Sequence, residues 1–186
     1  MQASRWEKLA AVPEEEFADV AKAKASRGAR SAEREQEKGG THVAQNSGEV
    51  EWYTPPDLIN AARRVMGGID LDPASCAKAN GTVKADRFFS KDDDGLAREW
   101  GGRVWMNPPY AKGLIDEFAK KLAIEVRVGR VSHACVLVNN ATDTGWFLAL
   151  SRVASAVCFP TGRVRFLDRD GNPVGAPLQG QAIIYA

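Results

Sequence analysis

The hydrophobic pattern of the chain changes near residue 49, after which apolar runs of two kinds alternate. Runs in which apolar residues recur every three or four positions indicate helices, and short continuous apolar runs indicate buried strands. The first kind predicts helices over residues 56–66, 114–128 and 144–153. The second kind predicts strands over residues 69–73, 104–106, 134–138 and 156–159. Strands that alternate with helices predict an α/β domain of three layers, in which the sheet is mainly parallel.

Two further runs near the end of the chain have alternating apolar residues, over residues 162–166 and 181–185. A turn-forming sequence, Asp170-Gly171-Asn172, lies between them. We therefore expect these two runs to pair as neighbouring strands across that turn region.

Residues 1–48 differ from the rest and predict an arm in front of a domain that covers residues 49–186. Residues 4–25 predict a helix, which a charged run over residues 33–38 follows. Both signs of charge alternate there, which favours a solvated helix or a flexible linker. An arm that binds a partner is the alternative.

Composition narrows the choice of function. The 186 residues include 44% hydrophobic residues, enough for one packed domain with a tail, and the formal net charge is only +1. Binding to nucleic acid would therefore need a local basic patch. The three cysteines lie far apart and form no Cys/His cluster, so we expect no metal. No apolar stretch is long enough for a membrane, and a reducing cytoplasm fits this composition.

The most informative motif is Asn107-Pro108-Pro109-Tyr110, which follows a predicted strand and precedes a predicted helix. The Asn107 side-chain carbonyl and a proline backbone carbonyl can both accept hydrogen bonds from one flat amino group. The prolines fix φ and donate no hydrogen bonds, so the turn presents acceptors in a set geometry. The Tyr110 ring can stack on the heterocycle that carries the amino group. This arrangement indicates chemistry on a planar amine.

The order of several motifs carries a family resemblance over roughly residue 51 to the end of the chain. The motifs are Trp52-Tyr53-Thr54-Pro55, Asp70-Leu71-Asp72-Pro73-Ala74-Ser75, Asp94-Gly95-Leu96, Trp100, Asn107-Pro108-Pro109-Tyr110 and Gly162-Arg163-Val164-Arg165-Phe166. In this order they resemble the phage-type DNA N6-adenine methyltransferases, the Dam-like family of phages and prophages. The resemblance implies a class I S-adenosylmethionine-dependent methyltransferase fold, which is a Rossmann-like three-layer sandwich.

The resemblance also implies S-adenosylmethionine as cofactor, DNA as partner and the cytoplasm of a bacterial or phage-infected cell as location. It implies catalytic roles for Asn107, Pro108, Pro109 and Tyr110. It implies cofactor binding by Tyr53, Thr54, Pro55, Asp70, Asp72, Ser75 and Asp94. Either Asp70 or Asp72 is expected to accept from the cofactor's ammonium or ribose hydroxyls. One departure is clear: Ser75, Cys76 and Ala77 stand where methyltransferases usually have a glycine-rich loop.

Some of these residues have a second interpretation. Thr54 donates to the cofactor carboxylate or caps the following helix. Asp94, with its neighbour Asp92, holds the adenosine amine or only solvates a loop. Arg163 and Arg165 contact DNA phosphates or are exposed strand charges.

The sequence thus predicts an enzyme that methylates the N6 amine of adenine in DNA by direct attack of a flipped base on the cofactor. One alternative is a methyltransferase that acts on an amine or amide of RNA or protein. Another is a DNA-binding protein of the same fold that has no activity. The oligomeric state and the recognition sequence stay open.

Overall fold

The structure is a computed structural model that describes residues 52–111, 113–174 and 177–186. The predicted arm of residues 1–48, with its helix over residues 4–25, lies outside the described residues. The described chain is a mixed α/β domain.

The helices and strands begin and end at defined residues. The described helices are α4 (Pro56–Met66), α5 (Ala77–Val83), α6 (Leu114–Arg127) and α7 (Gly145–Ser151), with a short 3-10 helix η1 (Gly95–Ala97). The described strands are β1 (Leu71–Asp72), β2 (Arg87–Phe88), β3 (Gly102–Met106), β4 (Val131–Asn139), β5 (Ala156–Cys158) and β6 (Gln181–Tyr185). The three helices and four strands predicted from periodicity are confirmed, with small shifts at their ends. The short elements α5 and β2 were not predicted.

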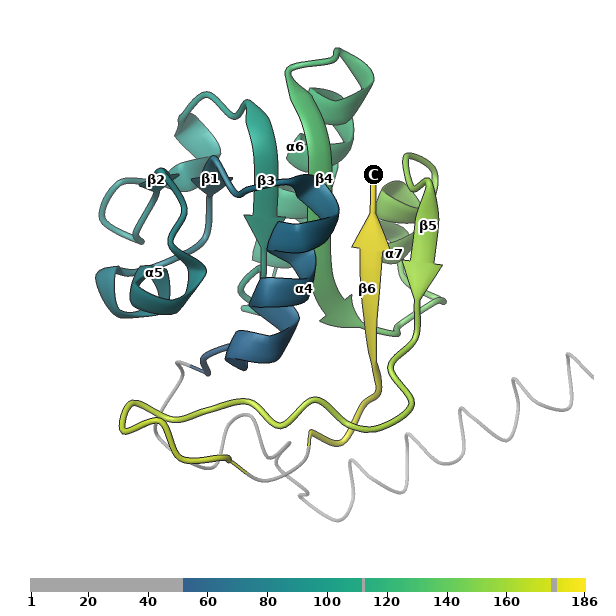
Figure 1. Cartoon of the computed structure of the whole chain (residues 1–186). Helices are drawn as coiled ribbons and strands as arrows, with labels where there is room; N and C mark the ends of the chain where they lie inside the picture. Colours follow the sequence, from purple (N-terminus) through teal and green to yellow (C-terminus); the bar gives the residue numbers. More distant parts are fainter. Residues whose placement is uncertain (1–51, 112, 175–176) are drawn as a thin grey trace, which may run out of the picture. The chain divides into compact units, whose positions relative to one another are not determined.

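Within the described residues the strands form one sheet in the order β2-β1-β3-β4-β6-β5 (Figure 1). Strands β2, β1, β3 and β4 pair in parallel. Strand β6 is antiparallel to both β4 and β5, between which it lies. The prediction of a mainly parallel sheet is therefore confirmed for β1 to β4.

Helices cover both faces of this sheet. Alternate residues of β3 point to opposite faces, so Val104 packs in one hydrophobic cluster and Trp105 in the other. Helices α6 and α7 contribute to the first cluster, with Phe118 and Leu150 among its members. Helix α4 contributes Ile59 to the second cluster. The three predicted layers are thus present.

The predicted pairing of residues 162–166 with residues 181–185 is wrong. Residues 162–166 form no strand, and β6 pairs with β4 and β5 instead. The alternation reflects burial alone: Val164 and Phe166 are buried, whereas Arg163 and Arg165 are exposed. The segment between β5 and β6 runs across the carboxyl ends of β3 and β4 (Figure 1).

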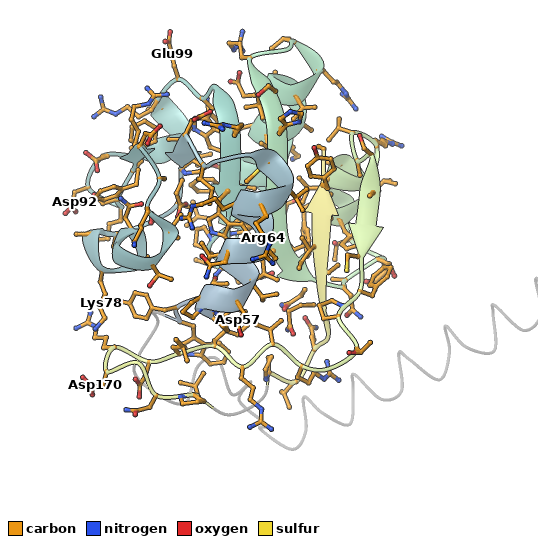
Figure 2. All side chains as sticks on the ribbon, viewed as in Figure 1. Asp57, Arg64, Lys78, Asp92, Glu99 and Asp170 are labelled. Carbon is orange, nitrogen blue, oxygen red and sulfur yellow. The ribbon has the colours of Figure 1, made fainter. Side chains whose placement is uncertain are left out.

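The topology creates one natural ligand-binding edge. The chain leaves β1 toward β2 on one side and leaves β3 toward β4 on the other. The carboxyl ends of β1 and β3 therefore flank a topological switch point, where open parallel sheets bind their ligands. Asp72 ends β1, and Asn107 directly follows β3. Glu99, before β3, marks the opposite edge, while Asp57 and Asp170 lie toward the carboxyl edge (Figure 2).

The loop before β3 closes tightly on the turn after β1. A Cβ atom on Gly95 would lie 2.1 Å from the carbonyl oxygen of Pro73. The indole Nε1 of the buried Trp100 donates to the Gly95 carbonyl at 2.7 Å. The motif residues Gly95 and Trp100 therefore hold the turn that follows Asp72.

We expect Gly95→Ala to destabilise the fold by about 1–3 kcal/mol, because the added Cβ would meet backbone atoms that cannot rotate away. Urea unfolding measures this change. Gly81→Ala is the matched control, because Gly81 lies in α5 with nothing within 4 Å of an added Cβ. That change should raise stability by up to about 1 kcal/mol through helix propensity. Equal midpoints for Gly95→Ala and the unchanged protein would contradict the proposed contact.

Candidate active site

Asn107 is fixed at the switch point by the segment that precedes α4. Its side-chain Nδ2 donates to the Thr54 hydroxyl over 3.4 Å, and Thr54 is only 8% exposed. This long hydrogen bond occupies the donor side of the Asn107 amide and leaves Oδ1 as its acceptor. The N-cap of α4 is Pro55, and no side-chain hydrogen bond caps the start of this helix. Thr54 therefore does not cap the helix, and its hydroxyl proton is available to a further acceptor.

Tyr110, three residues after Asn107, has its hydroxyl held by β4 while part of the residue stays exposed. The Tyr110 hydroxyl accepts from the backbone N–H of Asn139, the last residue of β4, at 2.5 Å. The Trp146 ring meets Tyr110 edge-on at a centroid distance of 6.4 Å. Burial at the hydroxyl end raises the pKa of Tyr110, so the phenol stays neutral. Tyr110 is nevertheless 46% exposed, which leaves ring surface for stacking. Between them, Pro108 is buried and Pro109 half-buried.

Asp72 is a buried carboxylate with few partners. It is 3% exposed, and its Oδ1 accepts from the backbone N–H of Ala74 over 3.3 Å. Burial raises the pKa of Asp72 to about 7, although the nearby Ser75 hydroxyl and the Ala74 amide act in the opposite direction. The Ser75 hydroxyl is itself buried and lies near the Asp72 carboxyl, but its oxygen forms no hydrogen bond of regular geometry with a described residue. An acceptor and a donor with unmet capacity thus lie together after β1.

Asp70 has a different environment from Asp72. Its carboxylate forms an ion pair with the Arg103 guanidinium at 2.5 Å and accepts from the Arg103 backbone N–H at 2.7 Å. The side-chain hydrogen bond from Arg103 holds the pKa of Asp70 below its usual range. Asp70 precedes β1 and Arg103 lies near the start of β3, away from the carboxyl edge. The Asp70 carboxylate already has its partners within the fold.

The segment before α4 is held by the segment between β5 and β6. The backbones of Tyr53 and Leu167 exchange two hydrogen bonds of 2.9 Å. The rings of Trp52 and Phe166 lie 5.8 Å apart. The Lys78 ammonium lies 5.7 Å from the centroid of the Tyr53 ring. Tyr53 and the half-buried Pro55 therefore frame Thr54, and Phe166 has a structural role that its motif did not predict.

Arg163 and Arg165 are both exposed on this crossing segment. No ion pair joins either arginine to a residue within the described ranges. Arg163 lies close to the carboxyl end of β4, because its Nη1 would lie 3.3 Å from a Cβ on Gly180, next to the Asn140 side chain. The two arginines are thus available on the side of the molecule where Asn107 lies.

Asp94 and Asp92 are exposed and lie before η1. Asp94 has a left-handed backbone with φ of 50° and gives no side-chain cap to η1. Its neighbour Asp93 instead accepts from the Ser90 amide and hydroxyl, at 2.9 and 2.7 Å. Asp93 therefore stabilises the shape of this loop. Among the described residues, Asp94 forms no hydrogen bond with the residues of the Asn107 site.

Asn139 belongs to this edge but was not singled out from the sequence. It ends β4, just as Asp72 ends β1 and Asn107 follows β3. The same signal, a polar residue at the end of an apolar run, would have found it. Its backbone rather than its side chain holds Tyr110.

The described residues contain neither a membrane-spanning helix nor a cluster of metal ligands. No helix among the described residues has the length and apolarity to cross a membrane. Within the same part of the chain, no group of three or more His, Cys, Asp or Glu side chains is arranged to hold a metal ion.

Comparison with known proteins identifies one family. The family model of DNA N-6-adenine-methyltransferase (Dam) matches residues 40–184, well over half of the chain. The match includes Asp72, Asn107 and the crossing segment. A comparison with curated proteins gave no match.

The buried Asp72 predicts a pH-dependent stability. Its folded pKa of about 7 lies above its ordinary value of 3.8, so the folded state keeps a proton that the unfolded chain releases. Its destabilising effect is absent at low pH and develops as the pH rises from about 4 to 7. We expect Asp72→Asn, which cannot ionise, to be more stable than the unchanged protein at pH 8 by about 2–4 kcal/mol. At pH 4 the two should be similar.

Urea unfolding at several pH values measures this difference. The matched control is Asp57→Asn, at an exposed position in the first turn of α4. Its effect should stay within about 1 kcal/mol at each pH, because the side chain is exposed. A difference between Asp72→Asn and the unchanged protein that stays constant over this range would show that folding does not raise the pKa of Asp72.

Proposed function

We propose that this chain, which belongs to the DNA N6-adenine methyltransferase (Dam) family, transfers a methyl group from S-adenosylmethionine to adenine N6 by direct attack of a flipped base. The family gives the general activity, methylation of adenine in DNA. The cofactor, the flipped base and the residue roles are our proposals. The observation that carries them is the position of Asn107, directly after β3 at the switch point where Asp72 ends β1.

Asn107 and Pro108 would hold the amino group of the target base. The N6 lone pair of adenine is delocalised into the ring, so the amine is a poor nucleophile. Acceptors at Asn107 Oδ1 and the Pro108 carbonyl favour a more tetrahedral nitrogen whose lone pair is free to attack. Thr54 supports this role, because it takes up the Asn107 Nδ2 donor and so fixes which end of the amide faces the base. Positioning and preset dipoles, rather than a covalent intermediate, would supply the acceleration.

Tyr110 would stack on the flipped base. Its hydroxyl is anchored to Asn139, while ring surface stays exposed beside the Asn107 motif. A duplex hides N6 within the base stack, so an enzyme that modifies this atom must extrude the nucleotide. A fixed aromatic face offsets part of the cost of unstacking, because stacking of a base on an aromatic side chain is worth about 1–3 kcal/mol.

The residues after β1 fit S-adenosylmethionine, which when bound supplies a methyl group on a positively charged sulfur. The buried Asp72 carboxylate has one described hydrogen bond and can accept from an ammonium or from hydroxyl groups. The buried Ser75 hydroxyl has unmet hydrogen-bonding capacity. Thr54 can donate its hydroxyl proton to a carboxylate. We assign the cofactor to Asp72 rather than Asp70, because the Asp70 carboxylate is already paired with Arg103.

Further residues complete the proposal. The α/β sheet with helices on both faces is consistent with a methyltransferase-like fold, and we propose the class I S-adenosylmethionine-dependent arrangement. Tyr53 and Pro55 would frame the cofactor side of Thr54. Arg163 and Arg165 would contact DNA phosphates, which position the duplex without specifying its sequence. The exposed position of Asp94 gives its cofactor role the weakest support.

One experiment separates this function from its alternatives. S-Adenosylmethionine with a labelled methyl group is incubated with DNA, RNA and protein, and digested DNA is analysed for N6-methyl-2′-deoxyadenosine. Label in DNA alone, at adenine N6, supports the proposal. Label in RNA or protein supports the alternative of another planar amine. Binding to DNA without any transfer would identify a protein that keeps the fold but has no activity.

Asn107→Ala should lower turnover by about 10²-fold or more, because the acceptor it removes acts mainly in the transition state. Affinity for the cofactor should stay within about twofold, because Asn107 is assigned to the base. The rate of methyl transfer and a calorimetric titration measure the two effects. Asn60→Ala, on the exposed side of α4, is the matched control and should keep full turnover. Near-normal turnover in Asn107→Ala would remove this residue from the mechanism.

Cofactor affinity should rise with pH. Only the ionised Asp72 accepts hydrogen bonds with both oxygens, and its pKa of about 7 means that the carboxyl is mostly protonated at pH 6. We expect S-adenosylhomocysteine to bind about tenfold more tightly at pH 8 than at pH 6. Asp72→Asn should bind more weakly at pH 8, by about 1–3 kcal/mol, and should lose most of this pH dependence. Calorimetric titrations of both proteins test this, and an equal pH dependence in the two would assign it to another group.

A further inference from the structure

Gln181 is a buried polar residue at the carboxyl edge of the sheet. It begins β6 and is only 4% exposed. It lies opposite Asn139, the last residue of β4, in the antiparallel pairing of these two strands. The next residues of β6 on the same face are Ile183 and Tyr185, which pack against a hydrophobic cluster. A polar side chain at the first position of this face therefore needs an explanation.

The Gln181 amide is hydrogen-bonded at both of its ends. Its Oε1 accepts from the backbone N–H of Val164 at 3.2 Å. Its Nε2 donates to the Gln179 carbonyl at 2.7 Å and, over a longer 3.4 Å, to the Asn139 side-chain oxygen. Both donors of the amide are thus used. Gln179 is a near neighbour in the chain, whereas Val164 and Asn139 lie 17 and 42 residues away. One side chain therefore joins three segments: the start of β6, the segment around Val164 and the end of β4.

One of these segments carries the candidate DNA contacts. Val164, whose backbone N–H donates to Gln181, lies between the exposed Arg163 and Arg165. The Asn140 backbone N–H donates to the Gly180 carbonyl at 2.9 Å, directly before Gln181. A Cβ on Gly180 would lie 2.8 Å from Asn140 Nδ2 and 3.3 Å from Arg163 Nη1. The position of Arg163 is therefore tied closely to the start of β6.

A second segment carries the candidate base-stacking ring. The Asn139 backbone N–H donates to the Tyr110 hydroxyl at 2.5 Å, so the same residue that faces Gln181 also anchors Tyr110. Hydrogen bonds thus run from Val164 through Gln181 and Asn139 to Tyr110. These residues span the distance between the exposed arginines and the Asn107 motif.

We propose that Gln181 is a positioning residue that sets the Arg163–Arg165 segment in register with Tyr110. DNA held by its phosphates at the arginines then presents the extruded adenine to the stacking ring and to Asn107. This inference rests on the function proposed above. An apolar side chain of the same size could fill the space but could not join the three segments.

Two variants test the role. Gln181→Met keeps the length of the side chain and loses all three hydrogen bonds. Gln181→Ala leaves room for water, which can satisfy the Val164 N–H and the Gln179 carbonyl without the mechanical link. Gln179→Met is the matched control, because the same change is made two residues earlier at an exposed side chain.

We expect turnover on DNA to fall about 10- to 30-fold in both Gln181 variants and to stay unchanged in Gln179→Met. Affinity for S-adenosylhomocysteine should stay within twofold, because Asp72 and Thr54 are not altered. The salt dependence of DNA binding should also be unchanged, because the same arginines meet the phosphates. Turnover is expressed per folded molecule, with the folded fraction taken from urea unfolding.

A double-mutant cycle separates positioning from simple stabilisation. Tyr110→Phe keeps the ring and removes the hydroxyl at the far end of the hydrogen-bonded series. If Gln181 acts through Tyr110, Gln181→Met should lower turnover less than threefold further in the Tyr110→Phe background. A loss of turnover that only follows the folded fraction would overturn the inference. It would also be overturned if the double variant lost turnover by the product of the two single losses, because the two residues would then act independently. Absence of DNA methylation by the unchanged protein would instead overturn the proposed function itself.

Discussion

The parallel pairing of β1 with β3 is the constraint on which the candidate site depends. β1 is only two residues long, yet it pairs with β2 on one side and with β3 on the other. This pairing brings the end of the Asp72 strand beside the end of the strand that leads to Asn107. The chain also reverses its direction of travel through the sheet at this point, so no crossover covers the edge between them. The tight contact of Gly95 with Pro73 maintains the turn that follows Asp72.

Asp72 shows how a site of this kind opposes stability. A carboxylate that is 3% exposed and has one described hydrogen bond carries a large desolvation cost, which the raised pKa of about 7 expresses. The pKa of Asp70, two residues earlier, is shifted in the opposite direction, because hydrogen bonds from Arg103 stabilise its ionised form. Of two acidic residues in one short motif, one stabilises the pairing of β1 with β3. The other keeps its capacity for a ligand, as proposed for the cofactor.

The sequence predicted those parts of the molecule in which local pattern and tertiary environment agree. The helix over residues 56–66 has an apolar face and a terminal Gly67 with φ of 75°, and the helix ends there. The positions of Asp72 and Asn107 at strand ends followed from apolar runs and from the parallel topology. The sequence could not distinguish Asp70 from Asp72, because the difference arises from Arg103, which lies 33 residues away from Asp70. β2 and α5 are too short to give a periodic signal.

Residues 162–166 show why alternation alone can mislead. Buried Val164 and Phe166 alternate with exposed arginines as in a strand, but the Val164 N–H donates to the Gln181 side chain rather than to a neighbouring strand. The segment is extended because it must cross the carboxyl edge, where its backbone also holds Tyr53 through Leu167. A domain of this size thus uses one segment for two tasks. It fixes the residues that precede α4, and in the proposed function it carries the contacts to DNA. Any shift of this segment would move Thr54 and the two arginines together. In the proposed mechanism, the same backbone therefore determines both the position of the cofactor and the position of the bound duplex.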